Sequence, residues 1–422
     1  MNELAHRLRT AVDTPALDEA ELRQRVRRMR ARRRVASVTT AVVAMAAAVV
    51  VATGIVSGLA SDRTVEFADR PGQDRAADAA GSPTWRTLSE APLTPRWGSV
   101  GAWTGTEYLV WGGYANGGSP DEEVADDGAA YDPATRRWRL LPRGPLPGMR
   151  EAAAAWSGEE LWIVGGAGGP NGYQDVLEAA AYDAGRDRWR RLPDPPVRAL
   201  TAAWSPTAQA VVIGGPGGRG DGLELWTLSR NDTTWRMLPK LPDDAQPAGD
   251  DPFVSVVSAG RHVFVVSTRG ILVFDLMAPT GWRGVGATVD LDARHYLTAT
   301  AVDNGLLALV DDQVWQYRWR DSPEDGSWTA VPSPPVTVNA NTRVTSISGG
   351  AQAVLYNTAA QAGAVLQTDR LSWQTLPPIP LRPRMDAVVI AHAPSDQSTN
   401  VFIWGGSTAR NLPYVDGALL TN

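Results

Sequence analysis

An arginine recurs just before successive apolar segments in the part of the chain after residue 84. The series comprises Arg96, Arg150, Arg198, Arg294, Arg343 and Arg384. Each lies 14 to 21 residues before a glycine pair or before the residues that replace such a pair, and one repeat carries Asp251 and Pro252 instead of the arginine. A guanidinium presents a planar fork of N–H donors that matches a carboxylate, sulfate or phosphate. If these side chains converge, they form a site for an anionic or sugar-like ligand.

Mutual repulsion limits how closely such arginines can gather, so nearby acids must balance them. Glu151 and Asp251 are placed to do so, together with the loop acids Asp121, Glu122, Glu123, Asp126 and Asp127. The alternative is that each arginine donates to backbone carbonyls and braces its own segment. The candidate ligand-binding residues are therefore Arg96, Arg150, Glu151, Arg198, Asp251, Arg294, Arg343 and Arg384.

The other side chains offer little for catalysis or metal binding. The chain has no Cys, which excludes disulfides, thiolate metal sites and cysteine nucleophiles. His262, His295 and His392 are far apart and lack the spacing of metal ligands. There is no nucleophile elbow, phosphate-binding loop or zincin helix. We therefore predict no metal site and no cofactor, and we assign no catalytic residue.

Tryptophan marks an internal repeat. All 17 Trp residues occur from Trp85 onward. Seven of them recur at a near-constant spacing, each followed three residues later by Leu or Val, at Trp85, Trp138, Trp189, Trp235, Trp282, Trp328 and Trp373. Five of these units run directly into a proline, at Pro142, Pro193, Pro239, Pro332 and Pro377. Self-similarity with a period of about 45 to 50 residues indicates a repeat architecture built of short strands.

Each period shares further features. Apolar runs end in glycine pairs at Gly112-Gly113, Gly165-Gly166, Gly214-Gly215 and Gly405-Gly406. An aromatic-Asp pair precedes the tryptophan at Tyr131-Asp132, Tyr182-Asp183 and Phe274-Asp275. In the fourth to sixth repeats the glycine pair is lost, and Ser267-Thr268, Asp311-Asp312 and Asn357-Thr358 stand near its place.

This combination resembles the kelch repeat of the galactose-oxidase-like propeller superfamily. The resemblance implies an all-β propeller over residues 84–422, in which four-stranded blades stack radially. Six full periods and an orphan first Trp unit predict seven blades, closed by a strand at 84–89 that completes the last blade; six blades are the alternative. The repeat residues are then scaffold, and the arginines lie near the mouth of the central channel, where propeller ligands usually bind.

The resemblance also bears on chemistry. The kelch family includes a copper radical oxidase, whose cofactor needs a Tyr–Cys crosslink and His ligands, and a chain without Cys cannot build it. Some kelch proteins process sialic acids with a channel Arg and Glu, and Arg150-Glu151 could act similarly.

The N-terminal 83 residues have a different character. Residues 1–34 carry ten Arg and five acids, whereas residues 35–60 carry no charge. An uncharged run of this length is sufficient for one transmembrane helix, and the basic flank places the N-terminus in the cytoplasm. A signal peptide cleaved near Ala60 is the alternative. Residues 61–83 form a polar linker.

These features predict a single-pass bacterial membrane protein with an extracytoplasmic propeller. The part after residue 60 carries 30 basic and 41 acidic residues, which argues against nucleic-acid binding. The leading function is a non-enzymatic module that binds a protein, glycan or anionic ligand. One alternative is a transmembrane sensor or regulator whose residues 1–34 contact a cytoplasmic partner such as a sigma factor. Another is a carbohydrate-processing enzyme of the sialate type.

Overall fold

The computed structural model describes residues 82–115, 123–169, 172–217, 222–247, 254–285, 297–339, 341–347, 350–395 and 398–421. All of them belong to one compact unit. The basic tail, the proposed membrane segment and nearly all of the linker lie outside this range. Within it, no helix is both long and apolar enough to cross a bilayer.

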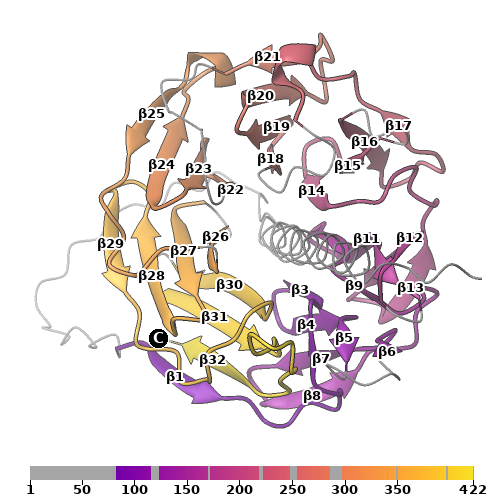
Figure 1. Ribbon diagram of the computed structural model, residues 1–422, viewed down its shortest axis with the longest axis vertical. Helices are drawn as coiled ribbons and strands as arrows, with labels where there is room; N and C mark the ends of the chain where they lie inside the picture. Colours follow the sequence, from indigo (N-terminus) through magenta and orange to yellow (C-terminus); the bar gives the residue numbers. More distant parts are fainter. Residues whose placement is uncertain are drawn as a thin grey trace, which may run out of the picture. The chain divides into compact units, whose positions relative to one another are not determined.

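The described residues form seven four-stranded antiparallel blades (Figure 1). Blade 1 consists of β3 (Val100–Trp103), β4 (Tyr108–Trp111), β7 (Gly128–Asp132) and β8 (Arg137–Leu140). Blade 2 consists of β10 (Ala153–Trp156), β11 (Glu160–Gly168), β12 (Gln174–Asp183) and β13 (Arg188–Arg191). Blade 3 consists of β14 (Thr201–Ser205), β15 (Ala210–Pro216), β16 (Leu223–Ser229) and β17 (Arg236–Met237). Blade 4 consists of β18 (Ser255–Ala259), β19 (His262–Ser267), β20 (Gly270–Asp275) and β21 (Arg283–Gly284).

The remaining blades repeat the same order. Blade 5 consists of β22 (Leu297–Val302), β23 (Gly305–Val310), β24 (Gln313–Arg318) and β25 (Ser327–Ala330). Blade 6 consists of β26 (Thr342–Ser346), β27 (Gln352–Asn357), β28 (Ala362–Gln367) and β29 (Ser372–Thr375). Blade 7 consists of β30 (Val388–Ser395), β31 (Ser398–Trp404), β32 (Gly417–Thr421) and β1 (Thr84–Thr87). Short 3₁₀ helices lie at η1 (Asp243–Ala245) and η2 (Pro323–Asp325).

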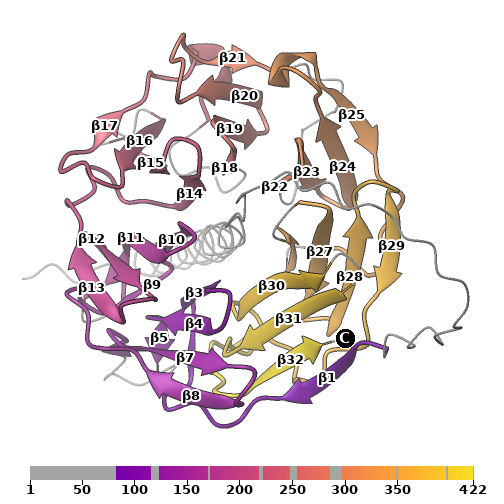
Figure 2. The ribbon, with the colours of Figure 1, turned by 180° about the vertical axis from the view of Figure 1, so that it is seen from behind.

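Short strands supplement the inner ends of blades 1 and 2. Strands β2 (Arg96–Trp97), β5 (Tyr114–Ala115) and β6 (Glu123–Val124) form a small sheet, and β9 (Met149–Arg150) pairs with β11. The first strand of each blade contacts the first strand of the next, and β30 contacts β3 (Figure 2). The series of blades therefore closes on itself, as the seven-bladed prediction requires.

The N-terminal strand of the ring lies in the last blade. Strand β1 pairs antiparallel with β32, with Trp85 opposite Leu420. The side chain of Trp85 packs against the core shared by blades 6 and 7. Blade 7 thus combines both ends of the propeller sequence, so that no blade is left with an open edge at the seam.

Hydrogen bonds between outer strands explain why tryptophan and proline recur together. In five cases the indole Nε1 donates to the carbonyl of the proline that follows the preceding Trp unit. The pairs are Trp189 to Pro142 (2.8 Å), Trp235 to Pro193 (2.9 Å), Trp282 to Pro239 (2.6 Å), Trp373 to Pro332 (2.7 Å) and Trp85 to Pro377 (2.8 Å). Trp138 donates in the same way to Ser89, at 3.0 Å. We call this contact the indole latch; among the described residues it joins six of the seven blades to their predecessors, and blade 5 is the exception.

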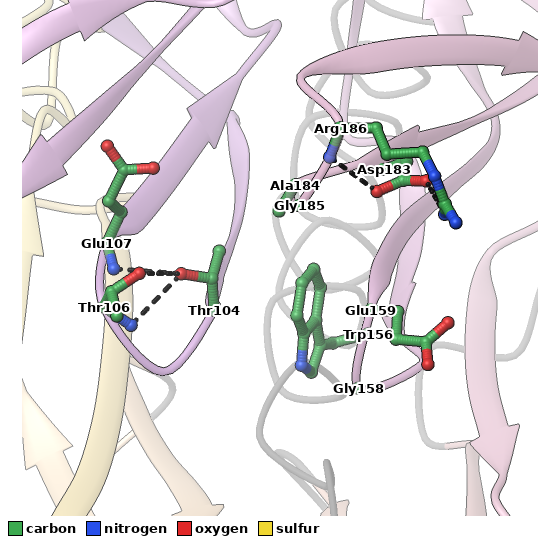
Figure 3. Close-up of a pocket in the computed structure, with 10 residues that line it drawn as sticks. All are labelled: Thr104, Thr106, Glu107, Trp156, Gly158, Glu159, Asp183, Ala184, Gly185 and Arg186. Atoms are coloured by element: carbon green, nitrogen blue, oxygen red, sulfur yellow. Dashed lines mark hydrogen bonds and ion pairs between the residues drawn. The ribbon is translucent and has the colours of Figure 1, made fainter.

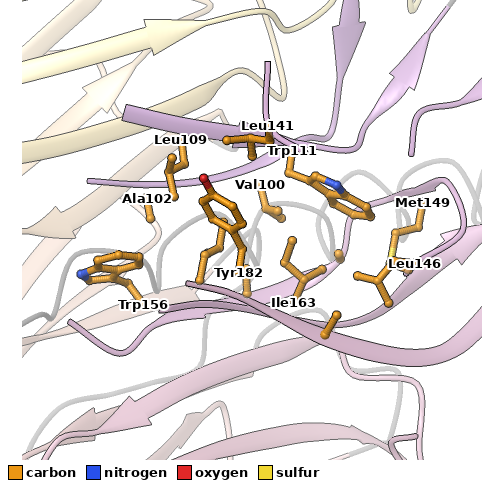
Figure 4. Close-up of a cluster of buried hydrophobic side chains, with 14 of the residues drawn as sticks. Val100, Ala102, Leu109, Trp111, Leu141, Leu146, Met149, Trp156, Ile163 and Tyr182 are labelled. Atoms are coloured by element: carbon orange, nitrogen blue, oxygen red, sulfur yellow. The ribbon is translucent and has the colours of Figure 1, made fainter. Parts of the chain in front are cut away.

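The space between blades is filled by the alternating faces of their strands. Between blades 1 and 2, Leu109 and Trp111 meet Ile163 and Tyr182, while alanines in β10 allow the sheets to approach closely (Figure 4). Burial of apolar surface of this kind contributes about 25 cal/mol per Å². The glycine pairs serve the same approach: a Cβ at Gly112 would lie 2.7 Å from the carbonyl oxygen of Met149 in the next blade.

The aromatic-Asp pairs build the outer hairpins. Asp132 Oδ1 accepts the backbone N–H of Ala134 at 2.8 Å, and Asp183 Oδ1 accepts that of Arg186 at 2.9 Å. Such Asx turns satisfy the backbone where the chain reverses. The aromatic partner, Tyr131 or Tyr182, lies buried between blades.

The indole latch gives a stability prediction. Trp85→Phe keeps an aromatic ring at the seam but leaves the Pro377 carbonyl without its donor. The free energy of unfolding should therefore fall by about 1 kcal/mol beyond the loss caused by the smaller ring. Trp328→Phe is the matched control, because the Trp328 indole has no partner among the described residues. Denaturant titrations of the full chain would show the difference, and equal losses in the two variants would contradict the role of the latch.

Candidate functional site

Two of the six arginines in the series brace their blades. Arg96 is 1% exposed. Its Nε donates to the Thr94 carbonyl at 3.0 Å, its Nη2 to Thr94 Oγ1 at 2.9 Å, and its Nη1 to Asp127 Oδ1 at 2.6 Å. The guanidinium therefore has its donors directed at the protein's own backbone and at an acid of the 121–127 loop.

Arg384 repeats this arrangement in blade 7. Its Nε donates to the Arg382 carbonyl at 3.1 Å, and its Nη1 donates to the Gly405 carbonyl at 2.8 Å. Asp416 pairs with it at 3.0 Å, and the ring of Tyr414 lies 4.5 Å from its Cζ. Arg384 thus occupies the bracing position, as Arg96 does in blade 1.

Arg150 sits one residue out of register with those two arginines. Gly406 donates to the carbonyl of Arg96, and Gly113 donates in the same way to the carbonyl of Met149. Met149 is therefore the counterpart of Arg96. Because successive residues of an extended strand point in opposite directions, Arg150 projects to the other side, where its Nη1 donates to Glu151 Oε1.

A backbone relay joins the starts of the innermost strands in blades 7, 1 and 2. Gly98 N–H donates to the Asp386 carbonyl at 3.1 Å, and Glu151 N–H donates to the Gly98 carbonyl at 2.9 Å. All three residues have left-handed backbone, with φ of 53° at Asp386, 66° at Gly98 and 52° at Glu151. This conformation is uncommon for Asp and Glu. The relay sets two carboxyl side chains on either side of a glycine.

These two carboxyls are electrostatically coupled to arginines from several blades. Burial raises the pKa of Glu151 to about 7; Arg150 opposes this rise, Asp386 adds to it and Arg198 opposes it. Burial also raises the pKa of Asp386, and Arg343 and Arg150 oppose that rise. For both groups, loss of hydration outweighs the nearby positive charge. We call Glu151, Asp386, Arg150, Arg198 and Arg343 the carboxyl–arginine cluster.

The members of this cluster differ in how they are held. Arg150 and Glu151 are nearly inaccessible, at 3% and 2% side-chain exposure, and Glu151 Oε2 has no hydrogen-bond partner among the described residues. Arg343 is buried and donates to the Thr342 carbonyl. Arg198 is 27% exposed, and its Nε lies 3.3 Å from Asp175 Oδ1, a carboxylate that is 59% exposed. Arg198 is therefore the most accessible guanidinium of the three.

The sequence series corresponds only partly to this cluster. Arg150 pairs directly with Glu151, and Arg198 and Arg343 act on Glu151 and Asp386 through their charge, whereas Arg96 and Arg384 occupy bracing positions. Arg294 and Asp251 lie outside the described residues. Asp386 was missed by the sequence analysis, because an acidic residue does not mark this position in every repeat. Aligning Arg384-Met385-Asp386 on Arg96-Trp97-Gly98 would have placed it at a left-handed position of the innermost strand.

The two described histidines have structural surroundings. His392 stacks on Trp103 with ring centroids 4.0 Å apart, and its Nε2 lies 2.8 Å from the Tyr108 hydroxyl. Burial lowers the pKa of His392 to about 4. His262 lies in blade 4, where its Nε2 is 3.8 Å from Asp275 Oδ2 on the neighbouring strand. Neither histidine contributes to the carboxyl–arginine cluster.

A concavity lies between blades 1 and 2, at the end of β10 opposite the carboxyl–arginine cluster (Figure 3). Its volume is 480 Å³, and Trp156 and the turns at 104–107, 158–159 and 183–186 line it. Its acids are paired with arginines: Glu107 with Arg139, Glu159 with Arg230, and Asp183 with Arg186. With its charges internally compensated, this groove gives no indication of a ligand.

Comparison with known proteins supports the fold. No protein-family model and no curated protein matches the chain. Among solved structures, the chain is similar to a fungal alcohol oxidase of the AA5 family, described as novel, with catalytic diversity, and solved in complex with copper. The TM-score is 0.60 and the sequence identity 11%, over 81% of this chain and 76% of the oxidase chain. The chain thus shares the β-propeller fold of this oxidase, and at this identity the likeness establishes the fold alone.

Copper does not fit the side chains of this protein. Among the described residues, no group of three or more His, Cys, Asp or Glu is arranged to hold a metal ion. The chain has no Cys, and His262 and His392 lie in blades 4 and 7. The likeness to a copper-containing oxidase therefore supplies no redox step for the residues that the structure describes.

The raised pKa of Glu151 gives a pH-dependent stability. Its carboxyl binds a proton more tightly in the folded than in the unfolded chain, so stability should fall as the pH rises from about 4.5 to 7 and level off above. Glu151→Gln should remove this part of the slope, reducing the loss between pH 4.5 and 8 by about 1–3 kcal/mol. Denaturant titrations at several pH values would measure it.

Glu159→Gln is the control for that measurement, because Glu159 is 69% exposed at the other end of the strands. It should leave the slope as in the unmodified chain. Identical slopes for the unmodified chain and Glu151→Gln would show that Glu151 is ionised in the fold throughout this range.

Proposed function

We propose that the protein is a non-enzymatic binding module whose carboxyl–arginine cluster receives the anionic group of a ligand. The observation that carries this proposal is the accumulation of five ionisable side chains, contributed by blades 2, 3, 6 and 7, at the starts of the innermost strands. Blade stacking does not need them, because the latch and the apolar cores join the blades elsewhere. Taking charges out of water is costly, and a ligand that supplies counter-charge would recover part of that cost.

Arg198 is the side chain best placed to meet such a ligand. It is more exposed than Arg96 or Arg384, whose donors are directed to backbone carbonyls and to aspartates. Its Nε makes no hydrogen bond to Asp175, whose carboxylate is 59% exposed, and an ion pair with so exposed a partner contributes little, typically about 0–1 kcal/mol. An incoming carboxylate or sulfate can therefore replace Asp175 at low cost.

Titration of the two carboxyls would make anion binding pH-dependent. Glu151 faces Arg150, Arg198 and Asp386, while Asp386 faces Arg343 and Arg150. As the pH falls through about 7, Glu151 gains a proton and the net charge of the cluster becomes more positive. An anion of constant charge should then bind more tightly at pH 5.5 than at pH 8.

Calorimetric titration of the full chain with sulfate, whose charge is constant over this range, tests the site. Arg198→Gln should weaken binding about tenfold or more, because a charge-assisted hydrogen bond contributes about 1.5–3 kcal/mol. Arg186→Gln, a change in the groove at the other end of β10, is the matched control and should bind as the unmodified chain does. Sulfate binding that is absent, or equal in Arg198→Gln, would refute the proposed site.

We also propose that residues 35–60 hold the propeller outside the cytoplasmic membrane, with residues 1–34 inside. The support is the uncharged run of 26 residues behind a flank of ten arginines. A tethered module of this kind would present its binding face to extracytoplasmic ligands.

The native absence of Cys makes the topology simple to test. In intact cells, a membrane-impermeant maleimide should label Asp62→Cys and should label Asn2→Cys only after lysis. Deletion of residues 35–60 should also release the chain from carbonate-washed membranes. Labelling of Asn2→Cys in intact cells, or an unchanged membrane fraction after the deletion, would contradict the anchor.

A further inference from the structure

An exposed aromatic ring lies beside the carboxyl–arginine cluster. Tyr173, just before β12, is 73% exposed, the highest value among the exposed large hydrophobic residues that the structure describes. Its ring centroid is 4.9 Å from the Cζ of Arg150. A large aromatic side chain left in water forgoes the stabilisation that its burial would give, so its position calls for a reason beyond folding.

The backbone next to Tyr173 is fixed. The carbonyl of Gly172 accepts the Nε–H of Arg150 at 2.9 Å, and the Gly172 N–H donates to the Gly169 carbonyl at 3.0 Å. Gly172 has φ of 65°, and a Cβ there would lie 2.6 Å from the ring of Tyr114. Only glycine fits this close approach, and it holds Tyr173 at a defined place.

The guanidinium of Arg150 orients the ring. It lies against Trp97 at 5.1 Å, Tyr114 at 5.4 Å and Tyr173 at 4.9 Å. Trp97 and Tyr114 are buried, whereas Tyr173 is not. Arg150 thus contacts the Tyr173 ring from within the protein, and the ring is positioned before any ligand arrives, which lowers the entropy lost on binding.

Groups that can bind an anion and hydroxyls adjoin this ring. Two residues after Tyr173, on the same side of an extended chain, Asp175 contacts Arg198 at 3.3 Å. On the inner side, Arg150 bonds Glu151, whose Oε2 has no partner among the described residues. The Tyr173 ring thus contacts Arg150, the partner of Glu151, and Tyr173 stands two residues before Asp175, the partner of Arg198.

We propose that Tyr173 is a stacking platform and that the ligand is a pyranuronate, a six-membered sugar ring bearing a carboxylate. The C–H face of the sugar packs on the exposed Tyr173 ring, and the carboxylate pairs with Arg198. This inference rests on the proposed anion-binding function and adds the ring to it. A simple inorganic anion uses Arg198 alone and gains nothing from the tyrosine.

Titrations of the full chain with methyl glucuronide, methyl glucoside and sulfate test the inference. The unmodified chain should bind methyl glucuronide more tightly than either of the other two. Tyr173→Ala should weaken methyl glucuronide binding about threefold to tenfold while changing sulfate binding less than twofold, and Tyr173→Phe should retain full affinity. Leu177→Ala removes another exposed apolar side chain of β12, 43% exposed, and should have no effect.

The outcomes separate the two proposals. Sulfate binding that depends on Arg198, with methyl glucuronide binding no tighter or unaffected by Tyr173→Ala, would overturn the stacking platform and leave the anion site intact. No binding of either anion would overturn both. A Tyr173→Ala variant that loses sulfate as well as methyl glucuronide would assign Tyr173 to holding Arg150, and would equally overturn the platform.

Discussion

The hydrogen bond from a tryptophan indole to the carbonyl that ends the preceding outer strand is the constraint on which the rest of the propeller depends. Neighbouring blades share no backbone ladder at their outer edges, so a side-chain bond must fix their spacing there. The proline in five of the six observed acceptors stops the outer strand and leaves its carbonyl available. Since the bond runs from Trp85 to Pro377 at the seam, the same contact that spaces the blades also closes the ring.

Closure by side chains at the rim leaves the inner ends of the blades free for other chemistry. There the chain places charged groups where water is largely excluded, and a backbone relay through Gly98 sets the carboxyls of Asp386 and Glu151 near each other. Burial weakens the ionisation of both groups despite the surrounding arginines. A scaffold that is secured at its periphery can tolerate such a cost at its centre, because breaking the cluster does not separate the blades.

The fold could be predicted from the sequence because its determinants repeat. The latch requires one tryptophan and one acceptor carbonyl per blade, and the outer hairpins require an aspartate two to three residues before the turn, as at Asp132 and Asp183. The tryptophan recurs in every blade, and the latch acceptor and the aspartate recur in several, so the sequence shows a period. The orphan unit at Trp85 indicated the missing outer strand of blade 7, where the structure has β1.

The site was less accessible to sequence analysis because its chemistry depends on register. Arg96 and Arg150 look equivalent as arginines ahead of an innermost strand, yet the bonds from Gly406 and Gly113 show that Met149, not Arg150, is the counterpart of Arg96. In an extended chain an offset of one residue reverses the side chain, and this turns a backbone brace into a partner of Glu151 and Tyr173. Spacing to the glycine pair, which varies from blade to blade, cannot resolve one residue. The hydrogen bonds between the left-handed residues Asp386, Gly98 and Glu151 do fix the register to one residue, and they also identify Asp386. Backbone conformation rather than residue type therefore separates the arginines that hold the blades from those that can meet a ligand.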